Sequence, residues 1–92
     1  MRAAGSRASL VLLVLLLGAC SPSLPDPDSR EAKLYVARCG VCHRIYAPHL
    51  LTAEMWKLQV ARMQEEMTRR GMRPLDAEER TAIMSYLTAH AG

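Results

Sequence analysis

Apolar residues recur at helical spacing through much of the chain, and no stretch shows the period-two alternation of a half-buried strand. One face of a central segment carries Trp56, Val60, Met63 and Met67. Thr52 precedes this segment as a candidate N-cap, and basic residues followed by Gly71 close it. The pattern therefore predicts a helix between Thr52 and Gly71.

A second helix is predicted before this one and a third after it. Asp28 and Glu31 fit a capping box, and the segment after them places Tyr35, Cys39 and Cys42 on one helical face. Asp76 and Glu79 fit another capping box. The apolar residues behind it, with His90, face roughly one way, and we expect His90 to lie on the surface of a fraying C-terminus. The chain is thus expected to be all-α, with about three helices and no internal repeat.

An uninterrupted apolar run, Leu10–Leu17, precedes the segments predicted to be helices. Two arginines lie before it, and two small residues separate it from Cys20, an order that is typical of an export signal. The run is too short to cross a bilayer core, which takes about 20 residues of helix. Leu17-Gly18-Ala19-Cys20 resembles the lipobox of bacterial lipoproteins, in which the cysteine is diacylated and becomes the N-terminus. An ordinary cleaved secretory signal is the alternative.

The chain accordingly divides into three parts. Residues 1–19 are expected to be a lipoprotein signal peptide, and residues 20–28 a lipidated Cys20 with a proline-rich tether that favours extended chain. Residues 29–92 form the folded domain. The resemblance to lipoproteins implies export and a lipid anchor on the periplasmic face of a bacterial membrane. Ser21 after the cysteine slightly favours the outer membrane.

Charge and size exclude several functions. The chain carries 12 basic and 9 acidic residues, a net charge of +3, which falls to +1 without the two leader arginines. No basic run remains that would follow a phosphate backbone, so we expect no nucleic-acid binding. A multi-layer enzyme fold does not fit in this length. With three Tyr, one Trp and no Phe, the core is thin, and small domains of this kind commonly need a cofactor or staple.

The residues Cys39-Gly40-Val41-Cys42-His43 read C-x-x-C-H, the attachment motif for c-type haem. The spacing suits the chemistry, because two thiols add to the two vinyl groups on one edge of a porphyrin. The next residue, His43, then presents an imidazole to the iron as the proximal axial ligand. We therefore expect one covalent haem c, bound through Cys39, Cys42 and His43.

Cys39 and Cys42 could also form a redox dithiol, a zinc site or a disulfide, and the sequence favours each of these less than haem. A redox dithiol of the thioredoxin kind belongs on a βαβ scaffold, and no strands are predicted. A zinc site needs a second pair of ligands, and only His49 and His90 remain, in no recognised spacing. A disulfide across two residues is strained and not structural.

Residues 29–92 resemble a small class I c-type cytochrome. The stretch Trp56–Met63 resembles the W-x-x-x-V-x-R-M pattern of short monohaem cytochromes, including those that serve sulfite dehydrogenases and related periplasmic oxidoreductases. Residues 83–87 are similar to the terminal I-x-x-Y-L of the class. The resemblance implies an electron carrier without catalytic chemistry of its own, working alone or as a subunit of a larger oxidoreductase. Its partners would be redox proteins: a periplasmic dehydrogenase, an oxidase or other cytochromes.

The sixth iron ligand is left open by the sequence. The candidates are Met55, Met63, Met67, Met72, His49 and His90. We favour Met63, because the helical stripe points its sulfur inward and it ends the short-cytochrome pattern. Met72 is the alternative, in the loop where ordinary class I cytochromes place their methionine. If the site is open or labile, the chain would instead be a haem-based sensor or ligand-binding lipoprotein.

Several arginines and one tyrosine are candidates for contacts around the haem. Since arginine pairs well with carboxylates, a haem propionate or an acidic partner could bind Arg44, Arg62, Arg69, Arg70 or Arg73, most of which we expect to be simply solvated. As a propionate neighbour we favour Arg62, beside Met63. Tyr46 either packs on the haem edge or caps a loop.

Overall fold

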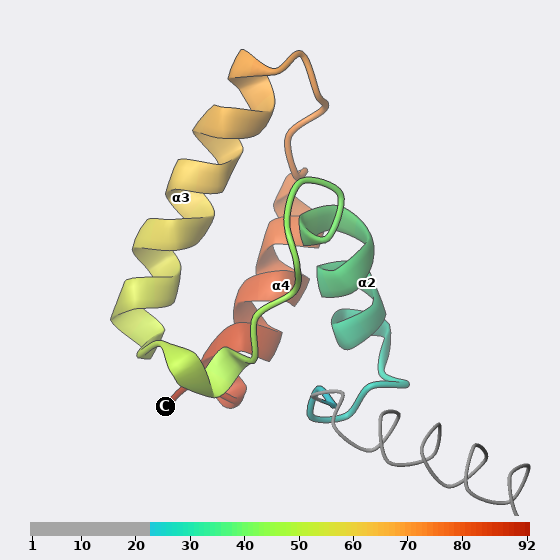
Figure 1. Cartoon of the computed structure of the whole chain (residues 1–92), viewed down its shortest axis with the longest axis vertical. Coiled ribbons are helices and arrows are strands. Elements are labelled where there is room, and N and C mark those ends of the chain that lie inside the picture. The colour runs from blue at the N-terminus through green and yellow to red at the C-terminus, as the bar shows by residue number, and fades with distance from the viewer. Residues whose placement is uncertain (1–22) are drawn as a thin grey trace, which may run out of the picture.

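The computed structural model describes residues 23–92, which contain three α-helices, one 3-10 turn and no strand. In chain order these are α2 (Arg30–Cys39), η1 (Pro48–Leu50), α3 (Ala53–Arg69) and α4 (Ala77–Ala89) (Figure 1). The all-α prediction is confirmed. The expected signal peptide and Cys20 lie outside the described residues. Within residues 23–92, every helix is too short or too polar to cross a bilayer.

Helix α2 begins one residue later than the capping-box pattern predicts. Its N-cap is Ser29, not Asp28, and the Ser29 hydroxyl accepts a 3.1 Å hydrogen bond from the backbone N–H of Ala32. A turn places Ser29 there, because its N–H donates to the carbonyl of Asp26 at 3.0 Å. The helix ends at Cys39, so Cys42 does not share its face as predicted.

The predicted ends of α3 and α4 agree with the structure. The Thr52 hydroxyl accepts from the N–H of Met55 at 3.2 Å, and α3 ends before Gly71, whose φ of 70° is the left-handed conformation that glycine adopts most easily. Asp76 and Glu79 form the complete capping box of α4. Local cap chemistry therefore sets these three boundaries.

Helix α4 packs against both α2 and α3 and forms the centre of the core (Figure 1). Its Tyr86 lies 5.8 Å from the ring of Tyr35 on α2, and Tyr35 meets Trp56 of α3 edge-on at 6.3 Å. Edge-to-face and tilted contacts at these distances are favourable beyond the area they bury. The buried apolar residues are Ala32, Tyr35, Cys39, Trp56, Val60, Met67, Leu75, Ile83, Tyr86 and Leu87.

The described part of the expected tether, residues 23–28, is partly packed on the domain through Leu24 and Pro25. Leu24 lies against the core, and the Tyr86 hydroxyl donates a 2.7 Å hydrogen bond to the carbonyl of Pro25. His90 is half-buried: its ring lies 5.0 Å from that of Tyr86, and its Nε2 is 3.6 Å from a carboxylate oxygen of Asp26. The expectation of a surface histidine at a fraying terminus is therefore wrong, because this segment covers the end of α4.

Candidate haem site

Two hollows that share His43 and Met63 lie between α3 and the chain that follows α2. The first, here the cysteine hollow, is about 230 Å³ and is lined by Arg38, Cys39, Cys42, His43, Met63, Glu66, Met67 and Arg70. The second, here the aromatic hollow, is about 300 Å³ and is lined by Tyr35, His43, Tyr46, Leu50, Leu51, Trp56, Gln59 and Met63. Their combined volume lies in the range of ligand pockets, roughly 300–1,000 Å³.

His43 reaches the hollows because α2 stops just before it. Gly40 caps the helix, with its N–H bonded to the carbonyl of Val36 at 2.9 Å, and the chain then turns. The Nδ1 atom of His43 lies 2.7 Å from the carbonyl of Arg44. When that nitrogen carries the proton and donates, the lone pair of Nε2 is available to a metal. This arrangement suits an axial imidazole ligand.

The two cysteines of the motif are free thiols that line the same hollow. Cys39 is buried, and burial raises the pKa of its thiol to about 11, opposed by the charge of Arg38. Cys42 is exposed, and its sulfur lies 3.9 Å from the sulfur of Met72. Both thiols therefore line the cysteine hollow together with His43, and neither lines the aromatic hollow.

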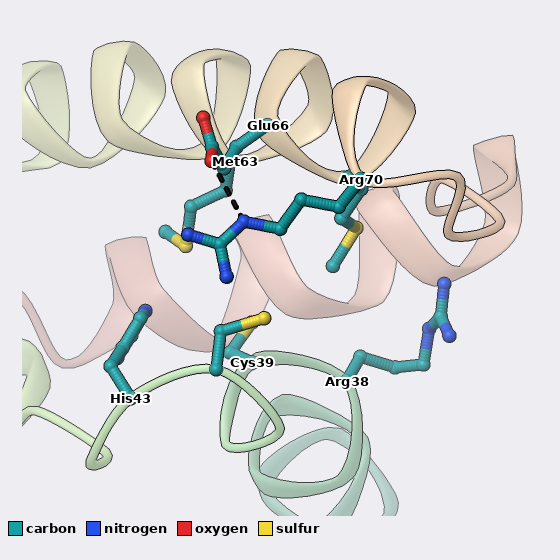
Figure 2. Close-up of a pocket in the computed structure, with 8 residues that line it drawn as sticks. Arg38, Cys39, His43, Met63, Glu66 and Arg70 are labelled. Atoms are coloured by element: carbon teal, nitrogen blue, oxygen red, sulfur yellow. Dashed lines mark hydrogen bonds and ion pairs between the residues drawn. The ribbon is translucent and has the colours of Figure 1, made fainter.

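Met63 projects from α3 into the space opposite His43 (Figure 2). Of the six candidate sixth ligands, it lines both hollows and Met67 lines one. Met72 is beside Cys42, at the edge of the site. The other three candidates line neither hollow. Met55 and His49 are exposed, and His90 lies beside Asp26, in the segment before α2.

On the cationic side of the site, the arginine that the sequence favoured is not the one that lines the hollow, while another candidate, Arg70, does line it. Arg62 is exposed and lines neither hollow, whereas Arg38 and Arg70 line the cysteine hollow. Arg70 reaches across it from the end of α3, held by a 2.8 Å hydrogen bond to Glu66 (Figure 2). This bond, with the nearby Arg69, lowers the pKa of the Glu66 carboxyl. Neither arginine is marked by the haem motif itself, although Arg38 directly precedes its first cysteine.

Arg38 also ties the site to α4. Its terminal nitrogen donates to the carbonyl of Arg73 at 2.7 Å. Its Nε is buried without a well-aligned hydrogen bond, 3.2 Å from a carboxylate oxygen of Glu79. The guanidinium of Arg38 is thus held by the Arg73 carbonyl and the Glu79 carboxylate, which fastens the C-terminal end of α2 to the start of α4.

The residues present fit a covalent haem. They supply two thiols, an imidazole with one free nitrogen, a thioether sulfur opposite it, cationic side chains on one side and aromatic walls on the other. Tyr46 contributes its ring to the aromatic wall, 5.5 Å from that of His43, and its backbone accepts a hydrogen bond from Tyr35. The ring of Tyr46 thus lines the aromatic hollow, and the loop is closed by its backbone carbonyl, not by its side chain.

A comparison with protein families identifies the type of domain. The sequence model of the family described as dihaem cytochrome c matches residues 35–92, which contain the C-x-x-C-H motif, α3 and α4. No curated protein and no solved structure matches the chain. Because the match covers more than half of the sequence and includes the site just described, the chain belongs to the dihaem cytochrome c family and is a c-type cytochrome, a haem protein of electron transfer.

Proposed function

We propose that this chain is a lipid-anchored periplasmic electron carrier with one covalent haem c, ligated by His43 and Met63. One observation carries the proposal: His43 and Met63 come from different elements, line the same two hollows, and face each other across the cysteine hollow (Figure 2). That is the arrangement an iron with two axial protein ligands requires.

The proposal of a single haem rests on the cysteines. The family is described as dihaem, but the sequence contains one C-x-x-C-H motif and three cysteines in total. Two thioether bonds use Cys39 and Cys42, and the third cysteine, Cys20, lies in the lipobox-like segment. A second haem attached by two thioethers would need another pair of thiols. The proposed chain is thus a monohaem, class I-like member of the family.

If methionine is the sixth ligand of the iron, the protein is suited to transfer electrons and not to bind and convert a substrate. A thioether ligand raises the reduction potential relative to two histidines, and an iron with six ligands has no position for substrate. The haem supplies the redox chemistry, while the chain sets its orientation, surroundings and access to solvent. Here His43 would be held by its Nδ1 contact, and Tyr35 and Trp56 would exclude water from the aromatic side.

Location and partners are inferred from the N-terminal sequence. Covalent haem of this type is matured outside the cytoplasm, in agreement with the export signal, and acyl chains at Cys20 would anchor the protein at about 0.8 kcal/mol per buried methylene. We propose residues 1–19 as the signal peptide and 29–92 as the cytochrome domain. The partners would be periplasmic dehydrogenases, oxidases or other cytochromes.

Mass and absorption spectroscopy of the purified holoprotein test this function. We expect the mass of one haem on the peptide that contains Cys39 and Cys42. We also expect a c-type reduced spectrum that carbon monoxide does not change. A carbon monoxide complex in the unmutated protein would mean an open sixth site and favour a haem-based sensor. A protein without covalent haem would contradict both functions.

A further inference from the structure

Residues 24–29, here the N-terminal strap, are fixed to the folded domain by contacts of different kinds. Leu24 packs against the core, and the carbonyl of Pro25 accepts the hydrogen bond from Tyr86. Asp26 lies beside His90, and its carbonyl closes the turn to Ser29. The strap therefore joins two helices, because Ser29 caps α2 while Tyr86 and His90 belong to the end of α4.

The composition of the strap supports an ordered segment. Pro25 and Pro27 restrict the unfolded chain, so that less conformational entropy is lost when the strap packs. Asp26 has a φ of 44°, a left-handed conformation that aspartate tolerates better than most residues. Tyr86 is buried, and its phenol finds its partner in the strap. A segment held in this way moves with the domain.

Such packing shortens the free connection to the proposed anchor. Between Cys20 and Leu24 there are three residues, and four extended residue steps span at most about 14 Å. If the chain were free as far as the start of α2 at Arg30, ten steps would span about 35 Å. The strap thus leaves the domain little freedom to rotate on the anchor.

The haem-attachment motif lies at the other end of α2 from the strap (Figure 1). The ten-residue helix separates the Ser29 cap from Cys39 by about 15 Å. A short anchor at the strap end would therefore place this end of α2 towards the bilayer, with the cysteine hollow facing away from it.

We propose that the N-terminal strap orients the domain on the membrane, so that the haem-attachment end faces the aqueous periplasm and a soluble redox partner. This inference rests on the proposed lipid anchor at Cys20 and the proposed haem. It predicts a fixed angle between the haem plane and the bilayer. A domain on a free tether would sample all angles.

Linear dichroism of the haem absorption in oriented bilayers, with the full-length lipidated holoprotein, measures this angle. We expect clear dichroism for the unmutated protein. A flexible Gly-Ser insertion of about ten residues between Ser23 and Leu24 adds roughly 18 Å of root-mean-square length, and should bring the signal to the isotropic value. The double variant Leu24→Ser, Tyr86→Phe should reduce it as well, because it releases the strap.

The matched control is Leu58→Ser, the same chemical change at an exposed leucine of α3, which should keep the dichroism. Absence of dichroism in membrane-bound, haem-loaded protein would overturn the inference and leave the proposed function intact. So would dichroism that persists with the insertion. Protein that carries haem but does not sediment with membranes would overturn the anchor and, with it, the oriented state.

Discussion

The Tyr35 hydroxyl donates a 2.8 Å hydrogen bond to the backbone carbonyl of Tyr46, and this bond closes the loop that carries the haem-attachment motif. Tyr35 is in α2, before the first cysteine, and Tyr46 follows His43. The ring of Tyr35 also contacts Trp56 and Tyr86. One side chain therefore connects the three helices to the segment that presents the proximal histidine.

Removal of this hydroxyl should destabilise the protein without opening a cavity. Tyr35→Phe keeps the ring but leaves the carbonyl of Tyr46 without its partner, at a cost of about 1–3 kcal/mol in the free energy of unfolding. Urea denaturation of the holoprotein measures it. Tyr46→Phe is the control, because the bond uses the backbone of Tyr46 and survives the change. Equal stability of Tyr35→Phe and unmutated protein would argue against the role.

The same phenol should make stability depend on alkaline pH. Burial, first of all, raises the pKa of Tyr35 from 10.0 to about 12. The folded state thus favours the protonated phenol, and this contribution is complete below pH 10 and is lost as the pH rises to about 12. Unfolding curves at several pH values should show a steeper alkaline decline for the unmutated protein than for Tyr35→Phe. Parallel declines would contradict the burial of an acidic phenol.

Two ion pairs between α2 and α4 should differ in strength. Arg38 and Glu79 are 19% and 15% exposed and make further contacts with the Arg73 segment, whereas Arg30 and Glu78 are 65% and 79% exposed. Arg38→Ala should lower the free energy of unfolding by about 1–3 kcal/mol, because buried polar groups lose their partners. Arg30→Ala, the matched control, should change it by less than about 1 kcal/mol. Equal losses in thermal or urea unfolding would contradict this difference.

Acid should weaken the contacts of Glu79, of which that with Arg73 is the strongest. The hydrogen bond from Arg73, followed by that from the backbone of Asp76, lowers the pKa of Glu79 from 4.5 to about 2. Its contribution to stability is present above pH 4.5 and is lost as the pH falls towards 2. Glu79→Gln should therefore flatten the acid limb of the unfolding midpoint against pH, while Glu78→Gln should leave it nearly unchanged. A Glu79→Gln profile identical to that of the unmutated protein would refute this assignment.

The sequence predicts best those features that neighbouring residues determine. Thr52, Asp76 and Gly71 set helix ends through contacts within a few positions, and each is where the pattern places it. The start of α2 is displaced by one residue because Asp28 and Ser29 are both good caps, and the turn at Asp26 decides between them. The local sequence pattern alone does not predict which of the two residues becomes the N-cap.

The features that could not be predicted from the sequence depend on contacts between residues far apart in the chain. The strap depends on Tyr86, 61 residues from the Pro25 carbonyl it binds, and the position of Arg38 depends on the Arg73 carbonyl, 35 residues away. No periodicity or motif encodes such pairs. The haem motif fixes its own three residues, but the cationic residues around them are brought there by the packing of α2 and α3 on α4.

The oxidised absorption spectrum of the holoprotein tests the central claim, ligation by His43 and Met63, most directly. The methionine-to-iron charge-transfer band at the red end should be present in the unmutated protein and in Met72→Ala, and absent in Met63→Ala. The same Met63→Ala protein should bind carbon monoxide when reduced, because its sixth position is vacated. Loss of the band in Met72→Ala, with the band retained in Met63→Ala, would contradict the account and move the ligand to the loop before α4.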